Sequence, residues 1–157
     1  GFGQGLVFAS TNNVIRGLVF SNWGWVGNPS SGGICVTTGN NAILGCYVGM
    51  DYLGTTRTGA NSWFGINISS ANNTIGDGTA SGRNLVSGNS QAAVFPFPAG
   101  IYITGSSATG NIIRGNIVGP QVNGATHIAA NQYIVINIAD AGSHSCHYEI
   151  GGLAAFS

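Results

Sequence analysis

A short apolar motif recurs along the chain at nearly regular intervals, and this repeat constrains the fold more than any other feature. Gly-Leu-Val-Phe, Gly-Ile-Cys-Val, Gly-Ile-Asn-Ile and Gly-Ile-Tyr-Ile begin at Gly5, Gly33, Gly65 and Gly100, and a degenerate copy, Val-Ile-Asn-Ile, begins at Val135. Successive copies are 28, 32, 35 and 35 residues apart. Periods of about 20–50 residues are typical of solenoids, propellers and repeat arrays.

Each copy has the pattern of a β-strand. Apolar residues stand at spacing two, as Ile66 and Ile68 do, so both side chains share one face. A second apolar run follows the copies after a corner, for example at 42–48 and 112–118. No stretch shows a 3.6-residue apolar stripe, and 125–133 is expected to supply a short helix at most. We therefore expect an all-β coil in which equivalent strands stack in parallel, about 4.8 Å apart.

Asparagine recurs at the corner between the two predicted strands. Asn13, Asn41 and Asn73 follow the first three copies at the same distance, and Asn111 follows the fourth after three extra residues. Stacked Asn side chains form amide ladders in which each copy hydrogen-bonds the next, and Asn tolerates the left-handed backbone of a sharp corner. We expect these four residues to form a structural corner ladder, which ends where the fifth copy has Ser143.

Several stretches resemble the repeat of right-handed parallel β-helices, the pectate-lyase-like solenoids found in bacterial surface and secreted proteins. They are Cys46-Tyr-Val-Gly-Met-Asp-Tyr-Leu-Gly-Thr, Gly65-Ile-Asn-Ile-Ser-Ser-Ala-Asn-Asn-Thr-Ile-Gly, Gly82-Arg-Asn-Leu-Val-Ser-Gly-Asn and Thr109-Gly-Asn-Ile-Ile-Arg-Gly-Asn-Ile-Val-Gly. The same fold carries pectate lyases, polygalacturonases, phage tailspikes and adhesins, so the resemblance indicates a fold and leaves the function open.

The resemblance implies one solenoid domain over residues 1–157. Clear repeats cover 5–119, and a degenerate last coil covers 120–157. At this repeat length the chain is expected to wind about four to five coils.

The chain carries very little charge. Four Arg, no Lys and four acids make up 5% of the residues, against about 25% in typical soluble domains. Nucleic-acid binding is not expected, because phosphates require a basic patch. No apolar run reaches the roughly 18 residues that span a bilayer, so membrane insertion is not expected either. Because the chain begins with Gly and shows no signal-like segment, we interpret it as a processed form or an excised segment.

The ionisable residues do not group into a catalytic or metal site. Asp51 and Asp77 occupy different positions in their coils, whereas a paired-carboxylate site needs two acids roughly 5–10 Å apart. The segment from His144 to Glu149, His-Ser-Cys-His-Tyr-Glu, has metal-ligand chemistry, but an alternating strand splits these ligands between two faces. We therefore predict that the chain is not an enzyme and has no metal or other cofactor.

The three cysteines do not form a disulfide framework. Cys35 lies between two inward-facing positions and is expected to point outward, whereas Cys46 is expected to point inward. Opposed directions disfavour a disulfide between them. With Cys146 the count is odd, so at least one thiol is unpaired within the chain.

Five aromatic residues fall in the loops between repeats. Loop aromatics serve as platforms for carbohydrate or as contacts with another protein, or they pack over the wall of the coil. These candidate interface or glycan contacts are Trp23, Trp25, Trp63, Phe95 and Phe97.

The ends of a solenoid expose unpaired backbone and apolar interior, and monomeric solenoids cap them. No amphipathic cap helix is predicted, the net charge is zero and there is no Lys to guard an edge strand. We expect uncapped ends that are covered by other copies or by flanking segments. The leading hypothesis is a structural extracellular or cell-surface subunit that self-associates head to tail into a filament or sheath. The alternatives are an adhesin or carbohydrate-binding segment of a larger surface protein, with a surface polysaccharide as partner, and then a polysaccharide lyase or hydrolase.

Overall fold

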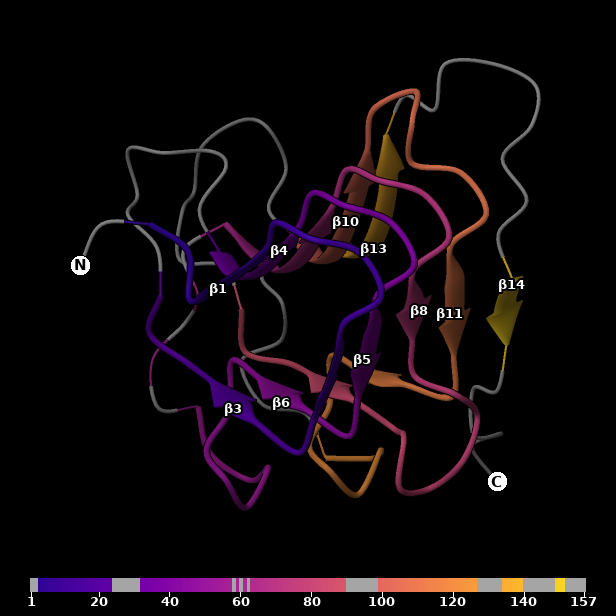
Figure 1. The fold of residues 1–157 in the computed structure, drawn as a ribbon. Helices are drawn as coiled ribbons and strands as arrows, with labels where there is room; N and C mark the ends of the chain where they lie inside the picture. The colour runs from indigo at the N-terminus through magenta and orange to yellow at the C-terminus, as the bar shows by residue number, and fades with distance from the viewer. Residues whose placement is uncertain are drawn as a thin grey trace.

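Parallel strands wound into a right-handed coil make up the protein (Figure 1). The computed structural model describes residues 3–23, 32–57, 59, 61, 63–89, 99–126, 134–139 and 149–151. These residues contain strands and turns and no helix. Residues 125 and 126 lie in a turn, and the rest of the short helix expected at 125–133 falls outside the described ranges. The prediction of an all-β parallel β-helix is confirmed.

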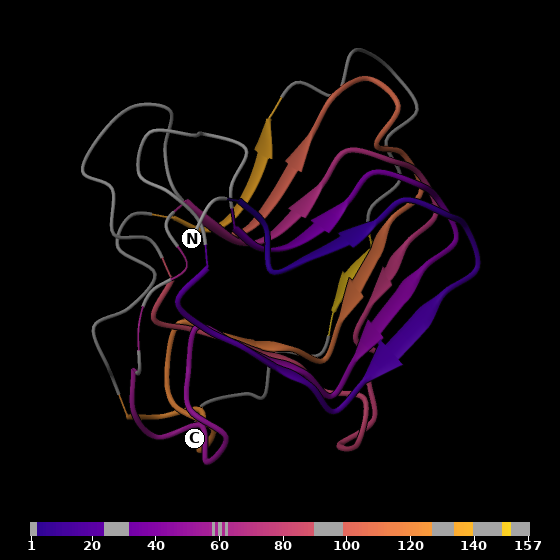
Figure 2. The ribbon, with the colours of Figure 1, turned by 60° about the vertical axis from the view of Figure 1, so that its left-hand side comes forward.

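Three parallel sheets form the walls of the coil, and Figure 2 looks along its interior. Sheet A consists, in spatial order, of β1 (Leu6–Phe8), β4 (Gly32–Val36), β7 (Phe64–Ile68), β10 (Ala99–Thr104) and β13 (Ile134–Ala139). Sheet B consists of β2 (Val14–Arg16), β5 (Ala42–Leu44), β8 (Thr74–Ile75), β11 (Ile112–Arg114) and β14 (Glu149–Gly151). Sheet C consists of β3 (Val19–Phe20), β6 (Tyr47–Val48), β9 (Leu85–Val86) and β12 (Ile117–Val118).

The chain visits sheets A, B and C in turn and then returns to A. We number the coils in chain order: β1–β3 form the first, β4–β6 the second, β7–β9 the third and β10–β12 the fourth. From the first coil to the last of these the three sheets advance together by about three turns, which is slightly fewer than the four to five coils predicted. β13 and β14 add one strand each to sheets A and B. Of the degenerate last coil at 120–157, only 120–126 and these two strands fall within the described residues.

The repeated motifs stack in register, which explains their spacing in the sequence. In sheet A, Ile66 pairs with Ile34 on one side and with Ile101 on the other. In sheet B, Ile43 pairs with Ile15 and with Ile75 in the same way. Each apolar side chain therefore packs on its equivalent in the next coil. The fully buried aliphatic side chains of this interior are Ile34, Ile43, Ile66, Ile68, Ile75, Ile101, Ile103, Val36, Val48 and Val86.

Glycine begins the motif because the chain is crowded where sheet C turns into sheet A. A Cβ on Gly65 would lie 2.6 Å from the Gly100 carbonyl oxygen and 2.8 Å from Val86 Cγ1. It would also lie 2.8 Å from Asn89 Nδ2. Real Cβ atoms do not approach other atoms so closely, so the recurring Gly is a packing requirement of the corner.

Candidate functional site at the first coil

The four asparagines predicted to form a ladder lie at the same corner of successive coils. The backbone N–H and Nδ2 of Asn13 both donate to Asn41 Oδ1, each at 2.9 Å. The N–H of Asn41 donates to Asn73 Oδ1 at 2.9 Å, and the N–H of Asn73 donates to Asn111 Oδ1 at 2.8 Å. Asn41, Asn73 and Asn111 are at most 2% exposed, so the corner is a buried polar column whose groups are satisfied.

The left-handed backbone at this corner belongs to the residue before each ladder asparagine. Asn12, Asn40 and Asn72 have φ values of 62°, 59° and 59°, and Gly110 has 65°. At three of the four corners the sequence therefore uses two asparagines for two purposes, and at the fourth corner Gly110 takes the place of the first. The first supplies the turn conformation and the second supplies the ladder amide.

Two further asparagine ladders lie at the other corners. Asn84 Nδ2 donates to Asn116 Oδ1 at 2.9 Å, and the N–H of Cys46 donates to Asn84 Oδ1 at 2.8 Å. Asn61 Nδ2 donates to Asn89 Oδ1 at 2.7 Å in the third ladder. The signal for the second ladder was the recurrence of Gly-Cys-Tyr-Val, Arg-Asn-Leu-Val and Gly-Asn-Ile-Val before the strands of sheet C. The third has no comparable motif.

The asparagine ladder at 13, 41, 73 and 111 has a direction, and the first coil stands at its open end. Each Oδ1 from Asn41 onward accepts a hydrogen bond from the coil before it. Asn13 Oδ1 accepts none from the residues that the structure describes, although Asn13 Nδ2 donates to the Ser10 carbonyl at 2.6 Å. The first coil thus presents an unused amide acceptor on its outer side.

The strands of the first coil are edge strands in all three walls. Within the described part of the chain, β1, β2 and β3 each stand at the end of their sheet and pair on one side only (Figure 2). Edge strands carry unpaired N–H and C=O groups that can template another strand. The first coil therefore combines three open edges with the open end of a ladder.

Apolar side chains are unusually exposed on the first coil. Of the ten large apolar side chains that are substantially exposed in the described residues, five lie between positions 3 and 23. Val14 is the most exposed of the five, at 65%. An accumulation of this kind marks an interaction surface. The other four are Val7, Leu18, Val19 and Trp23.

The first coil is almost free of charge. Arg16 is the one charged residue between positions 3 and 23, and its Nη2 lies 3.9 Å from Asp77 Oδ2. Hydrogen bonds from the Thr79 side chain and N–H, with the charge of Arg16 adding to them, lower the pKa of Asp77 against an opposing effect of desolvation. The loop that holds Asp77 reaches back from the third coil to the first, so the ion pair ties Arg16 to the wall.

The aromatic residues predicted as contacts occupy different environments. Trp23 is 44% exposed, and its backbone N–H donates to Asn61 Oδ1 at 3.0 Å. Trp63 is only 4% exposed and packs in a cluster with Phe64 and Tyr102, whose rings stack at 4.4 Å. Burial leaves Trp63 no open ring face for a ligand. Trp25, Phe95 and Phe97 lie outside the described residues.

The acids considered for catalysis each close their own turn. Asp51 Oδ1 accepts from the N–H groups of Thr55 and Thr56 at 2.9 and 3.1 Å. Desolvation acts to raise the pKa of Asp51, but these hydrogen bonds and one from Gly54 together lower it. Asp77 Oδ1 accepts from the Thr79 hydroxyl at 2.6 Å. Their oxygens are thus engaged in holding loops.

Metal sites and membrane-spanning helices are absent from the described ranges. These residues contain no group of three His, Cys, Asp or Glu side chains that could hold a metal ion. They also contain no helix of the length and apolarity that crossing a membrane requires. Cys35 and Cys46 are buried and form no disulfide within the described part of the chain. The side chains of the segment from His144 to Glu149 lie outside the described part.

No protein-family model, no curated protein and no solved structure matches the chain. The class of the protein, a parallel β-solenoid, therefore stands on the repeat and on the wound sheets.

Proposed function

We propose that this protein is a structural subunit that associates head to tail with further copies of itself and builds a filament or sheath outside the cell. The observation that carries the proposal is the surface of the first coil, which holds five of the ten substantially exposed large apolar side chains of the described residues and a single charged residue, Arg16. A parallel coil laid on this face would extend all three sheets by strand pairing. Such a contact is heterologous, and heterologous contacts that do not close produce open filaments.

The chemistry of the first coil favours a partner of the same kind. A further coil would supply N–H groups to Asn13 Oδ1 in the way that Asn13 itself supplies them to Asn41. It would also remove the exposed apolar side chains of Val14 and Val19 from water. Charge does not oppose the contact, because Arg16 is paired with Asp77 and the net charge of the chain is zero.

The extracellular setting is part of the proposal. The chain has four Arg and no Lys, so it offers few sites to trypsin-like proteases, which suits an exposed fibre. The repeat also resembles that of pectate-lyase-like solenoids in bacterial surface and secreted proteins. We place the chain among such surface solenoids on that resemblance.

The proposed role is non-enzymatic. Its support lies in Asp51 and Asp77, whose carboxylates accept hydrogen bonds from their own loops instead of converging on a shared site. A polysaccharide lyase or hydrolase would need acids that face a substrate. An assay for reducing sugars or unsaturated products on a panel of polysaccharides tests this part, and turnover that is lost in Asp51→Asn or Asp77→Asn would overturn it.

Sedimentation velocity over a concentration series tests the assembly. The wild-type chain should form large species, whereas the double variant Val14→Lys/Val19→Lys should remain monomeric, because Lys on an edge strand blocks strand addition. The matched control is Tyr52→Lys/Leu53→Lys, which adds the same charge at exposed positions of a loop after sheet C. The control should assemble like the wild type. A folded wild-type monomer at high concentration, or equal assembly of the edge variant, would contradict the proposal.

An adhesin or glycan-binding role is the second candidate, and the exposed ring of Trp23 favours it. In that case the chain would be a soluble monomer once flanking coils are supplied. It would bind a surface polysaccharide, and Trp23→Ala would abolish the binding. A glycan array with both proteins separates this role from self-assembly.

A further inference from the structure

Trp23 stands in the first coil at the position that asparagines hold in the next two coils. Its backbone N–H donates to Asn61 Oδ1 at 3.0 Å, in the way that a ladder residue donates to the amide of the following coil. A Cβ on Gly5 would lie 2.8 Å from Trp23 Cγ, just as a Cβ on Gly33 would lie 2.8 Å from Asn61 Nδ2. The indole therefore occupies the first position of the ladder that Asn61 and Asn89 continue.

Leu18 has the same relation to the second ladder. The N–H of Tyr47 donates to the Leu18 carbonyl, and the N–H of Leu85 donates to the Cys46 carbonyl, each at 2.9 Å. Leu18 and Cys46 are therefore equivalent residues of successive coils, and Asn84 follows them in this ladder. Two of the three ladder positions in the first coil thus carry a large apolar side chain.

Neither side chain can continue a ladder toward a further coil. A ladder amide accepts, through Oδ1, a hydrogen bond from the coil before it, as Asn84 accepts the N–H of Cys46 at 2.8 Å. Leucine has no acceptor in its side chain, and the indole of tryptophan only donates. Whatever covers the first coil therefore meets apolar side chains at these two corners and no amide acceptor.

Both apolar side chains are open to solvent. Leu18 and Trp23 are 46% and 44% exposed, whereas Cys46 and Asn61, at the same positions of the second coil, are fully buried. The backbone is held here by hydrogen bonds from the N–H groups of Asn22 and Trp23, so little of it would have to be ordered on binding. A large aromatic side chain presented in this way is typical of the residues that anchor protein interfaces.

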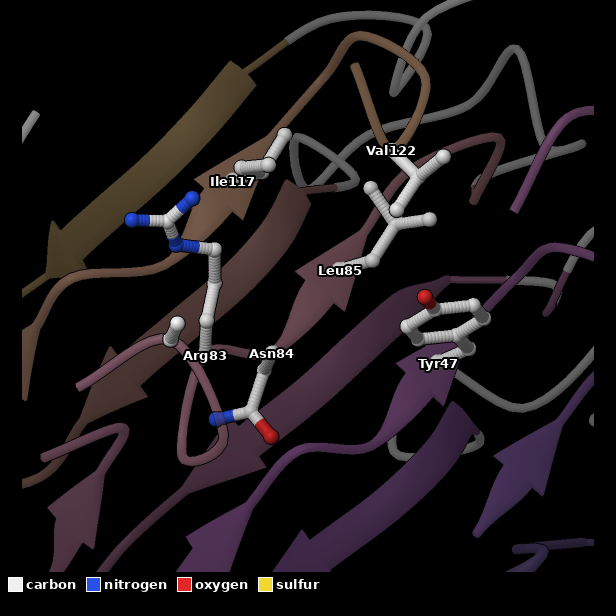
Figure 3. A pocket seen from close by; sticks show the side chains of 7 residues that line it. Tyr47, Arg83, Asn84, Leu85, Ile117 and Val122 are labelled. Atoms are coloured by element: carbon white, nitrogen blue, oxygen red, sulfur yellow. The ribbon is translucent and has the colours of Figure 1, made fainter. Parts of the chain in front are cut away.

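The later coils cover their outer apolar side chains with loops of the same chain. Figure 3 shows this on sheet C, where Val122, from the loop after β12, lies beside Leu85 and Tyr47 and leaves a cavity of about 160 Å³ beside Arg83. Leu85 is buried as a result. Val19 pairs with Tyr47 and continues the same row in the first coil, yet it is substantially exposed. The first coil thus keeps open the kind of surface that the later coils cover.

We propose that Leu18 and Trp23 anchor the contact between copies, and that the second and third ladders end at this junction instead of running through it. This anchoring rests on the proposed head-to-tail assembly, to which it adds the side chains that hold the copies together. The occupant is the last coil of a second copy, because a face with Arg16 as its one charged residue suits a partner as poor in charge as this chain. The later coils of one chain meet through amide acceptors at these corners, so the junction is chemically distinct from such a contact.

Leu18→Asn/Trp23→Asn tests the anchors, since it places an amide at both ladder positions and removes the exposed apolar side chains. In sedimentation velocity over a concentration series, this variant should need at least about tenfold more protein than the wild type to form large species. Circular dichroism should show an unchanged fold, because asparagine already occupies the equivalent positions of later coils. The matched control, Tyr52→Asn/Leu53→Asn, removes exposed apolar side chains from a loop and should assemble like the wild type.

The outcomes separate the anchors from the assembly itself. A wild-type chain that does not assemble would contradict both. Assembly of the wild type together with equal or stronger assembly of the asparagine variant would overturn the anchors alone, and so would an equal loss of assembly in the control. Loss of glycan binding in the single variant Trp23→Asn, with assembly unchanged, would assign the indole to the second candidate function and overturn its role as an anchor.

Discussion

Cys46 stands in line with Asn84 in the second ladder, one coil before it. The N–H of Cys46 donates to Asn84 Oδ1 at 2.8 Å, just as the N–H of Asn84 donates to Asn116 Oδ1 at 3.2 Å. A thiol therefore takes the place of an amide at this position. Burial raises the pKa of Cys46, against smaller effects of hydrogen bonds from Leu18 and Gly17.

Cys46→Asn is expected to stabilise the protein. Asn84 and Asn116 donate through Nδ2 to Ile43 and Ile75 carbonyls, and by the sheet register the equivalent acceptor for position 46 is the Ile15 carbonyl. One added buried hydrogen bond contributes about 1 kcal/mol, which raises Tm by about 2–4 °C in a domain of this size. Thermal unfolding by circular dichroism measures the change. Cys46→Ala serves as the control, and an asparagine variant no more stable than the alanine variant would refute the completed ladder.

Asn73→Ala should cost more stability than Asn13→Ala, although both remove a ladder amide. Asn73 is 1% exposed, and its loss leaves the N–H of Asn41 without an acceptor inside the wall. We expect a cost of about 2–4 kcal/mol at Asn73. Asn13 stands at the open end, where water can replace it, and about 1 kcal/mol is expected there. Urea unfolding gives both free energies. Equal costs would show that the stability contributed by a ladder amide does not depend on its burial.

Gly65→Ala is expected to disrupt the corner between sheets C and A. The added methyl would meet the Gly100 carbonyl oxygen and Val86 Cγ1, at 2.6 and 2.8 Å, and overpacking of this kind costs about 1–3 kcal/mol or more. Gly17→Asn is the contrast, because position 17 has φ 69° with nothing within 4 Å and Asn tolerates that conformation. Urea unfolding of the two variants should therefore separate the cost of steric crowding at position 65 from the cost of a left-handed backbone at position 17. Similar losses in both would contradict the packing explanation.

The hydrogen bonds from Thr79 to Asp77, with a lesser effect of the Arg16 charge, make stability depend on acid pH. The pKa of Asp77 is lower in the folded protein than its ordinary value. The carboxylate therefore contributes stability at pH above its unfolded pKa, and the contribution is lost as pH falls through the folded pKa. NMR titration of Asp77 should find a midpoint below 3.8. Asp77→Asn should flatten the pH dependence of unfolding in the same window, and a midpoint at or above the ordinary value would disprove the assignment.

The two buried thiols should resist chemical modification. Desolvation raises the pKa of Cys35 to about 12, against a smaller effect of a hydrogen bond with Gln4, and the pKa of Cys46 is raised as well. Only the thiolate reacts readily. At about pH 8 a thiol reagent should leave both unlabelled in the folded protein and label both in denaturant, as peptide mass spectrometry can map. Rapid labelling of either in the folded protein would contradict its burial.

The walls of the coil could be predicted because stacking ties sequence to structure directly. Equivalent positions such as Ile34 and Ile66 must pack on each other, so the motif recurs at the coil length, and the same necessity holds for Asn41 and Asn73. The second ladder is harder to recognise in the sequence because Cys46 interrupts it in the second coil. Its asparagine in the third coil is Asn84.

The loops could not be predicted in the same way, since nothing repeats in them. Trp63 falls between two strands in the sequence, yet it is buried in a cluster with Phe64 and Ala99, against Tyr102. The cavity beside Arg83 also depends on loops, which come from different coils and meet only in space. Its residues carry no spacing that the sequence alone would reveal.

Electron microscopy of the purified chain tests most directly whether the first coil receives another copy. The account predicts unbranched fibres in which strands run across the axis at a spacing of about 4.8 Å and subunits follow one another every 15–20 Å or so. It also predicts that Val14→Lys/Val19→Lys forms no fibres. Well-folded single particles of the wild-type chain at high concentration, or fibres that leave β1–β3 exposed, would contradict it.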